Sequence, residues 1–584
     1  MEFVHDDFHW IDWAVIAGYL LLTTFVGHMM RGQQGTIKDF FLGGKSLPWP
    51  AVSGSMIATE ISGVTFIGVA GTLFALNGNF SYLLWGIGSI MGRVLVAKYF
   101  VPKFFEQEIF SPYDYMKRRI GGGAKTLATV IFTVGSILGQ SVRVYVAALP
   151  LQIVTGMNIG VCVVIIGILA IIWTLMGGMR TVIWTDVMQF FLFTFGGILT
   201  LVWIIGGLNG GWGEFWETAN LYARFDTWDA RLEPHLSFTI WVAIIAVPFQ
   251  NMTAFGVDQL NAQRMFCCKD KVSAQKALVW SSVGQLLTLM MLLVGAALVV
   301  HYDNNPFTAK EAVVAMKVDH TQPGAHELAL EKVAAAPRLE HPEATAARVE
   351  YIAANPSDPT AANFTHEKIS TVPVPANKDG VFPMWIVTVL PVGLSGLILA
   401  GVFAAAISSL DSILAALSQT TISLIYHPET KTEQELKELK ILQKSKVLVV
   451  IWGIILTLFT FAILVLADKI PVLPLAFGLT AYTMGPLLGI FLCAFWGRGS
   501  TAGLVTGVVL SFLMVMFVRT DIWLLLHNAG MDVSWLAQSF TYKPTEGAFP
   551  IASIYNFAWM WPITTVVTIL CGLLIPRKPD QGDE

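Results

Sequence analysis

Long apolar stretches recur along the whole chain and restrict it to one class of fold. Thirteen of them are long enough, at about 20 mostly apolar residues each, to cross a bilayer as helices. In lipid, every backbone polar group must be hydrogen-bonded within the protein, and a helix does this within one segment. The chain is 55% hydrophobic and 13% charged, whereas a soluble domain carries about 25% charged residues. We therefore expect an all-α polytopic membrane protein in the lipid bilayer, with about 13 transmembrane helices.

Basic residues give the expected orientation of these spans. The spans are predicted at residues 9–30, 47–74, 78–106, 123–155, 158–177, 181–206, 237–263, 274–301, 385–425, 444–467, 471–496, 500–519 and 553–575. Lys and Arg concentrate in the connections after odd-numbered spans, with Lys125 near the third and Arg264 after the seventh. Such residues mark the cytoplasmic side. We predict a multi-pass protein of the plasma (inner) membrane, with its N-terminus outside and its C-terminus in the cytoplasm.

One apolar stretch, residues 399–417, carries a carboxylate in its middle. Asp411 costs about 2.5–3.5 kcal/mol to insert at membrane depth, which makes it a functional candidate. Ser408, Asp411 and Ser412 are spaced i, i+3 and i+4, and so lie on one helical stripe. Hydroxyl and carboxylate oxygens suit a hard cation. The alternative is that the serines bond to their own helix and ease packing.

Two further spans have the composition of interrupted helices. The second span is rich in Gly, Ser and Thr and holds Glu60 at its centre, and the seventh contains Pro248 and Gly256. Interrupted helices in corresponding positions of two halves indicate an inverted repeat with a central binding site. Glu60 also allows another interpretation, a close-packed helix in which this carboxyl is paired or protonated.

The interrupted spans set the expected division of the chain. We predict an extra span and inside loop (1–46), a first five-helix repeat (47–206), an outer loop (207–236), a second five-helix repeat (237–496) with an outer insertion (302–380), and two C-terminal spans with a short inside tail (497–584). In the insertion we expect short amphipathic helices and loops. Its histidines lack metal-ligand spacing, and Asn363 begins a glycosylation sequon.

The chemistry-bearing motifs of enzymes do not stand out in this sequence. We find no Walker motif, dinucleotide fingerprint or catalytic constellation, and the five cysteines have no metal-binding spacing. We therefore expect a protein that is not an enzyme, has no organic cofactor, and has neither a nucleic-acid partner nor an obligate protein partner.

Several motifs together resemble the sodium:solute symporter family, which includes bacterial sodium–galactose and sodium–proline carriers. The resemblance covers roughly residues 10–500 and is carried by Ile57-Ala58-Thr59-Glu60-Ile61-Ser62, Gly177-Gly178-Met179-Arg180, Trp184-Thr185-Asp186, Gln263-Arg264 and Ala404-Ala405-Ala406-Ile407-Ser408-Ser409. It implies a LeuT-type inverted repeat of five plus five helices, with Na⁺ as the coupling ion.

The resemblance also implies ligands for sodium. Ala58, Ile61 and Ala405 match positions that bind sodium through backbone carbonyls, and Ser408 and Ser409 match two hydroxyl ligands. In some relatives an acid that matches Asp186 helps to form a second sodium site with residues one turn past the serine pair. A second sodium at Asp186, Ser408, Asp411 and Ser412 is therefore expected, and the stripe found from residue spacing coincides with it.

The solute site is less constrained. Of the polar positions that hold the sugar in the galactose carrier, only Asn251 keeps its residue type, and the gating tyrosine falls at Ala254. The candidate substrate-facing residues are Glu60, Thr65, Gln140, Arg143, Asn251 and Phe255. Arg143 could pair with a substrate carboxylate, or it could neutralise Glu60 or an aspartate.

These observations predict a sodium-coupled secondary active symporter that imports a small polar organic solute by alternating access. The sugar, carboxylate and amino acid classes all remain open. A proton-coupled carrier that uses Asp411 and Glu60 is the nearest alternative. A transporter-like membrane sensor is the alternative from another class.

Overall fold

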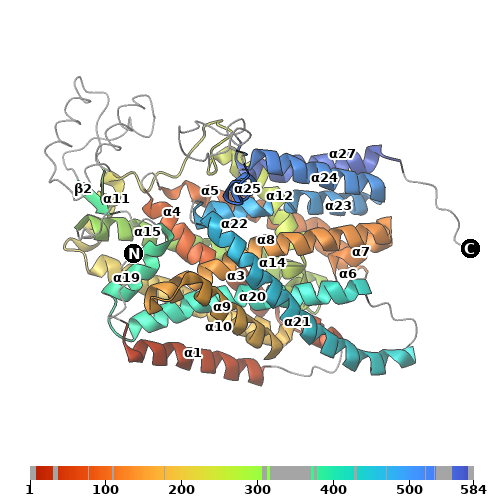
Figure 1. Cartoon of the computed structure of the whole chain (residues 1–584), viewed down its shortest axis with the longest axis horizontal. Helices are drawn as coiled ribbons and strands as arrows, with labels where there is room; N and C mark the ends of the chain where they lie inside the picture. Colours follow the sequence, from red (N-terminus) through yellow and green to blue (C-terminus); the bar gives the residue numbers. More distant parts are fainter. Residues whose placement is uncertain are drawn as a thin grey trace, which may run out of the picture.

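The computed structural model describes residues 8–30, 37–75, 78–107, 109, 111–176, 178–304, 312–315, 370–373, 378–425, 431–467, 470–519, 521–531, 533 and 555–576. Within these ranges the protein is a bundle of helices whose axes run mostly side by side (Figure 1). The fold class predicted from the sequence, an all-helical membrane protein, is confirmed.

The first half of the chain contains one long N-terminal helix and the elements of the first predicted repeat. These helices are α1 (Trp10–Met29), α2 (Ile37–Leu42), α3 (Trp49–Glu60), α4 (Ala70–Phe74), α5 (Leu84–Leu95), α6 (Val101–Phe105), α7 (Pro112–Ile120), α8 (Gly122–Thr155), α9 (Ile159–Met176), α10 (Met179–Gly206) and α11 (Gly211–Leu221).

The second half continues with the interrupted seventh span and ends in a pair of C-terminal helices. Its elements are α12 (Val247–Met252), α13 (Gln259–Phe266), α14 (Lys271–Trp280), α15 (Gln285–Asn304), β1 (Ala312–Ala315), β2 (Ser370–Pro373), α19 (Val381–Val389), α20 (Leu394–Ile425), α21 (Lys431–Ala467), α22 (Val472–Thr480), α23 (Met484–Trp496), α24 (Thr501–Val518), α25 (Asp521–Asn528) and α27 (Met560–Leu574).

Ten helical segments of the described chain are long and apolar enough to cross a membrane, and the bent pair of helices in the second predicted span makes an eleventh. The other two predicted spans coincide with shorter apolar helices, Ile159–Leu175 and Val242–Val257. The count of thirteen stays a prediction. The predicted ninth span, 385–425, is divided, because α19 ends at Val389 and α20 begins at Leu394 after Pro391 and Gly393.

The outer insertion differs in part from the expectation of helices and loops. Its described part contains β1 and β2, which pair antiparallel with Ala312 opposite Pro373. Asn363 and the four histidines of this insertion lie outside the described residues.

The second predicted span is interrupted where the sequence indicated. Helix α3 ends at Glu60, a π-helical segment begins at Val64, and the two halves are bent by 54°. Ile61 at the break has φ −79° and ψ 77°, which is not helical. The Ser62 N–H, which a continuous helix would direct to the Ala58 carbonyl, donates to the Glu60 carbonyl at 3.0 Å. Because of the break, the Ala58 carbonyl does not accept the Ser62 N–H as it would in a regular helix.

The seventh span is also interrupted, but not at the proline that suggested it. Helix α12 follows the π-helical segment Val242–Ala246 directly, so Pro248 lies inside a continuous helical run and does not interrupt the span. The break falls at Asp258, whose backbone is extended and whose carboxylate accepts the Leu260 N–H at 2.8 Å. The sequence feature that marks this break is therefore Asp258 itself, an aspartate at the N-cap of α13.

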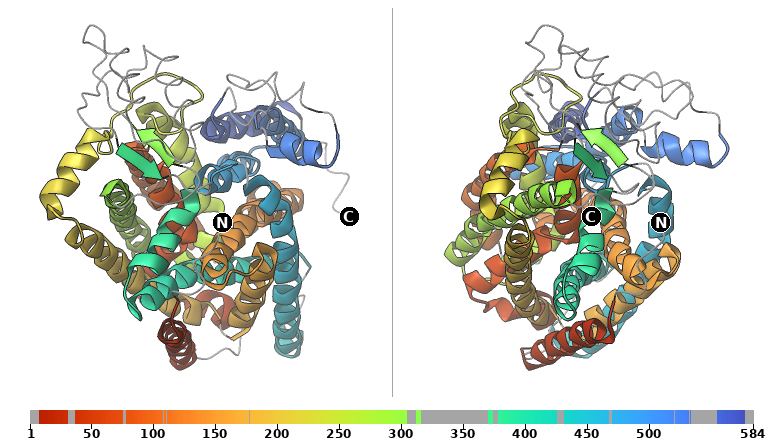
Figure 2. Two further views of the ribbon diagram at one scale, coloured as in Figure 1. Left: turned by 60° about the vertical axis from the view of Figure 1, so that its left-hand side comes forward. Right: turned by 90° about the vertical axis from the view of Figure 1, so that its left-hand side faces the viewer.

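Helix α20, which carries the Ser/Asp stripe, lies inside the bundle and is enclosed by protein along nearly its whole length. Helix α1 packs on α20 and α10 from the outside, on the side opposite the C-terminal helices α24 and α27 (Figures 1 and 2). The carboxylate of Asp12 in α1 accepts the N–H groups of Gly393 and Gly396 at 2.7 and 2.8 Å. Asp12 is 1% exposed and caps the N-terminus of α20 from another helix.

Replacing Asp12 by Ala should lower thermal stability, because the first N–H groups of α20 lose their acceptor. The loss of an N-cap costs about 1 kcal/mol, and Asp12→Asn, which still offers an oxygen, should stay near the wild type. The measurement is thermal unfolding of purified protein at constant sodium. Thr24→Ala is the control, because Thr24 bonds only within α1 through the Leu20 carbonyl. Equal losses for the Ala variants at both positions would rule out this cap.

Candidate functional site

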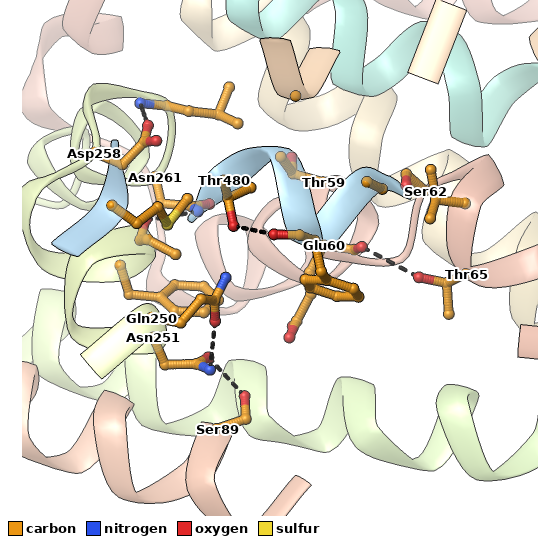
Figure 3. Close-up of a pocket in the computed structure, with 18 of the residues that line it drawn as sticks. Thr59, Glu60, Ser62, Thr65, Ser89, Gln250, Asn251, Asp258, Asn261 and Thr480 are labelled. Carbon is orange, nitrogen blue, oxygen red and sulfur yellow. Dashed lines mark hydrogen bonds between the residues drawn. The ribbon is translucent and has the colours of Figure 1, made fainter. Parts of the chain in front are cut away.

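A cavity of about 170 Å³ lies between the two interrupted helices. Residues around both breaks line it, including Thr59 to Ser62 on one side and Asp258 and Asn261 on the other (Figure 3). Helices α5, α8, α15 and α22 complete the wall. A cavity at two helix breaks in a membrane bundle is the arrangement of solute sites in secondary transporters.

All six residues that the sequence nominated for the solute line this one cavity. They come from the second, fourth and seventh predicted spans and are Glu60, Thr65, Gln140, Arg143, Asn251 and Phe255. The structure thus shows that these six residues lie together. Their role in solute binding stays a prediction.

The carboxylate of Glu60 pairs with a residue that sequence reasoning did not select. Its Oε2 accepts a hydrogen bond from Nη2 of Arg93 in α5, and its Oε1 accepts one from the Gln285 amide at 3.3 Å. Arg93 is fully buried and stacks on Phe255, with its guanidinium carbon 4.3 Å from the ring centroid. Arg93 therefore forms the direct ion pair with Glu60. Arg143 interacts electrostatically with the carboxylates of Asp258 and Glu60 at longer range, and its alternative role of neutralising an acid stays open.

Polar side chains join α5 to α12 beside this pair. Ser89 donates to the Asn251 side-chain oxygen at 2.8 Å, and the Asn251 amide donates to Gln250 at 2.8 Å (Figure 3). A Cβ at Gly92 would overlap the Asn251 side chain, so the two helices approach closely here. This wall is closely packed and presents amide and hydroxyl groups.

Arg143 lines the cavity, whereas Arg93 lies behind its wall. Nη1 of Arg143 donates to the Thr59 carbonyl at 3.3 Å, at the last turn of α3 before the break. Within the described part of the chain it takes part in no ion pair. The guanidinium is thus held in place by a backbone carbonyl and keeps donors for an anionic group.

The residues expected to bind the first sodium surround the break in α3. Ala58 and Ile61 are buried at the break, and Ala405 lies in α20 one turn before the serine pair. Ser409 faces the break, and its hydroxyl donates to the Thr59 carbonyl at 3.4 Å. The neighbouring Ser408 hydroxyl donates to Asp186 Oδ1 at 2.7 Å. Of the two hydroxyls, that of Ser409 thus meets the α3 break, whereas that of Ser408 is directed to α10.

The four residues expected to hold a second sodium lie together around one buried arginine. Asp186 Oδ2 accepts from Arg264 at 3.1 Å and from Ser55 at 2.5 Å. The Arg264 guanidinium also donates to Ser412, whose hydroxyl lies 3.0 Å from Asp411 Oδ1. Asp186, Arg264 and Asp411 are at most 2% exposed.

Sequence reasoning counted Arg264 and Lys125 among the charges of inside connections, and the structure shows that both side chains are buried within the protein. Arg264 is fully buried in α13, and Lys125 is 8% exposed and pairs with Asp114 at 2.9 Å. Arg264 follows an apolar segment in the chain but turns back into the bundle. The signal that could have identified it was its position only six residues after the break at Asp258.

The fold and the cavity define a membrane transporter with a solute site at two interrupted helices. Among solved structures, a substrate-bound, outward-open Na⁺-coupled sialic acid symporter shares this fold, with a TM-score of 0.70, 24% identity and 97% coverage of each chain. The inverted-repeat, LeuT-type fold expected from the sequence is thereby confirmed.

Residues 40–335 and 358–511 match the sodium:solute symporter family, and the chain belongs to it. It is 27% identical over 520 residues to the sodium/sialic acid symporter SiaT of Proteus mirabilis, covering 88% of this chain and 90% of that protein. The sodium/glucose cotransporter of Vibrio parahaemolyticus is 24% identical over 531 residues, covering 89% and 87%. Human sodium-coupled monocarboxylate transporter 1 is 30% identical over 306 residues, about half of each chain. The chain is a multi-pass membrane protein and a sodium-coupled solute symporter.

Replacing Arg93 by Gln should destabilise the protein by about 3 kcal/mol, because it leaves the Glu60 carboxylate without its cation inside the bundle. The double variant Glu60→Gln with Arg93→Gln should recover most of that loss, since no charge is then unpaired. Thermal unfolding of the two single variants and the double variant checks this as a double-mutant cycle. Lys103→Gln, at an exposed pair with Glu106, is the control and should change little. Additive losses in the double variant would contradict the pairing.

Proposed function

We propose that this symporter imports a small polar organic solute that bears a carboxylate, with Arg143 as the carboxylate partner. The observation that carries this proposal is a guanidinium in the cavity wall that donates to one backbone carbonyl and takes part in no ion pair with another described residue. Arg93 does not compete for the role, because Glu60 and Phe255 hold it. Two of the relatives carry carboxylic acids by name, sialic acid and monocarboxylates, and this supports the same class.

The other cavity residues suit a polar solute around that carboxylate. Glu60, Asn251 and Gln140 offer acceptors and donors, and Thr65 donates to the Glu60 carbonyl at 3.5 Å at the mouth of the break. Phe255 covers Arg93 and supplies an apolar face. Such mixed walls orient a small molecule through a few polar contacts.

Sodium in this proposal binds first at the break in α3. The ligands are the carbonyls of Ala58, Ile61 and Ala405 and the hydroxyls of Ser408 and Ser409. The lost helical hydrogen bond at Ala58 supports this assignment, because a freed carbonyl inside a membrane protein needs a partner. The ion would join α3 to α20 and complete the wall of the solute cavity.

In the proposal a second sodium ion binds at Asp186, Ser408, Asp411 and Ser412. For a carboxylate solute, this second ion increases the accumulation that the carrier can support. One sodium with one monovalent anion moves no net charge, so a tenfold sodium gradient alone supports about tenfold accumulation. With two sodium ions, one net charge also moves through about 100 mV, which is worth about 2.3 kcal/mol. The total of about 5 kcal/mol would support roughly 5,000-fold accumulation.

The repeat division and the orientation belong to the same proposal. Residues 47–206 and 237–496 form the two repeats, and one helical bundle rocks against the other around the cavity while sodium and solute enter from outside and leave inside. The N-terminus lies outside and the C-terminus in the cytoplasm, as the basic connections indicate. Proton coupling through Glu60 is disfavoured, because that carboxylate already has Arg93 and Gln285 as partners.

Ser409→Ala should raise the sodium concentration for half-maximal stabilisation about tenfold, because the cation loses one ligand oxygen and this fold-change equals about 1.4 kcal/mol. The measurement is the melting temperature of detergent-purified protein against sodium chloride, with potassium chloride keeping the ionic strength constant. The control is Ser418→Ala on the same helix, which bonds to Ser445 outside the site. An unshifted curve for Ser409→Ala would remove this residue from the sodium site.

Carboxylate solutes should stabilise the protein in sodium chloride but not in potassium chloride, and Arg143→Gln should weaken that effect about a hundredfold, equal to roughly 2.7 kcal/mol. The test is a thermal-shift screen of sialic acid, small monocarboxylates, amino acids and neutral sugars. Arg118→Gln, an exposed arginine of α7, is the control. Sodium-dependent stabilisation by a neutral sugar, with none by any carboxylate, would contradict the solute class.

A further inference from the structure

Six side chains form a polar centre inside the bundle, next to the break in α3. Ser55 comes from α3, Asp186 from α10 and Arg264 from α13, and α20 supplies Ser408, Asp411 and Ser412. All six are at most 2% exposed. The centre therefore has to balance its own charges, because its side chains are almost fully shielded from bulk solvent.

Arg264 uses its guanidinium to join all four elements. Its Nε donates to Ser55 at 2.9 Å, its Nη1 to the Leu260 carbonyl at 2.7 Å, and its Nη2 to Asp186 at 3.1 Å and to Ser412. Asp186 also accepts from Ser55 and Ser408. The Arg264–Asp186 pair is thus extensively hydrogen-bonded and neutral in sum.

Asp411 stands outside this pairing. Its Oδ1 accepts a hydrogen bond from the Ser412 hydroxyl at 3.0 Å, and no described cation lies within ion-pair distance of its carboxylate. Two carboxylates and one guanidinium leave the centre with one net negative charge. An uncompensated buried charge costs several kcal/mol, so the centre is short of one monovalent cation.

We propose that Arg264 acts as the resident cation of this centre, limits it to one sodium ion, and leaves Asp411, rather than Asp186, to hold that ion by charge. The inference rests on the second sodium of the proposed function and specifies which carboxylate binds it. Asp186 serves as the partner of Arg264 and offers the ion, at most, a shared oxygen. Arg264 is covalently bound to the chain and cannot leave with the solute, so the centre alternates between one negative charge and none.

The test counts the sodium ions bound by the purified full-length protein, with no solute present. The melting temperature is followed against sodium chloride at constant ionic strength, with potassium chloride as the replacement. Far above half-saturation, each bound ion adds the same stabilisation per tenfold rise in sodium, so two ions give twice the slope of one. The wild type should show the slope of two ions and Asp411→Asn the slope of one.

The decisive variant removes both members of the ion pair. Asp186→Asn with Arg264→Gln leaves Asp411 as the charge of the centre, and we expect the slope of two ions to remain. A fall to the slope of one would mean that Asp186 holds the ion and would overturn the proposal. As a matched control, Asp521→Asn with Arg519→Gln removes another buried pair, at the outer end of α24, and should keep the wild-type slope.

A second pair of variants tests the charge of Arg264. Arg264→Gln combined with Asp411→Asn again leaves one net negative charge, now on Asp186, and should restore the slope of two that Asp411→Asn alone loses. Arg264→Lys, which keeps the charge, should behave like the wild type. If the combined variant keeps the slope of one, the charge of Arg264 does not set the ion count. A slope of one in the wild type, unchanged in Asp411→Asn, would instead disprove the second sodium site itself.

Discussion

The break at residues 61–63 of the second span is the constraint on which the rest of the site depends. Inside a bilayer a helix cannot open without new partners for the backbone groups it frees. Here the Thr59 carbonyl accepts hydrogen bonds from Arg143 and Ser409, and the Ser62 N–H donates to the Glu60 carbonyl. The cavity and the residues of the proposed sodium site share this one break, so in the proposal binding at one would alter the groups available to the other.

Buried arginine–carboxylate pairs hold the helices around that break. Glu60–Arg93 joins α3 to α5, and Asp186–Arg264 joins α10 to α13. Each pair connects an interrupted helix to a continuous one. Because a buried pair adds little net stability but is costly to separate, these pairs fix position more than they stabilise. Arg143, Asp411 and the cavity-lining Asp258 are charged groups outside these two pairs.

The sequence predicted the parts of this arrangement that depend on local pattern. Span composition, the small and polar residues around Glu60, and the stripe of Ser408, Asp411 and Ser412 each carry a signal within a few residues, and the helices and the first break lie where these signals indicated. For the seventh span the sequence offered both Pro248 and Gly256 as break points. The break at Asp258 lies two residues after Gly256, whereas Pro248 is accommodated within a helical run.

The pairing of charges could not be predicted in the same way. Glu60 and Arg93 are 33 residues apart, Arg264 and Asp186 are 78 apart, and Asp12 caps a helix that begins more than 380 residues later. No periodicity links such positions, and the positive-inside pattern even assigned Arg264 to the water phase. Only the packing of helices decides which arginine meets which acid, and that choice determines the ligands.

The charges left after pairing connect the two proposals physically. A solute carboxylate brings one negative charge to Arg143, and the cavity accepts it because Arg93 is already neutralised by Glu60. A single sodium at the break would cancel the solute's charge and leave transport insensitive to the membrane potential. A second ion at Asp411 restores one net positive charge to the loaded carrier. The membrane potential contributes to the uptake of a monovalent carboxylate only when two sodium ions accompany it. A carboxylate solute therefore makes the second cation site energetically useful for uptake.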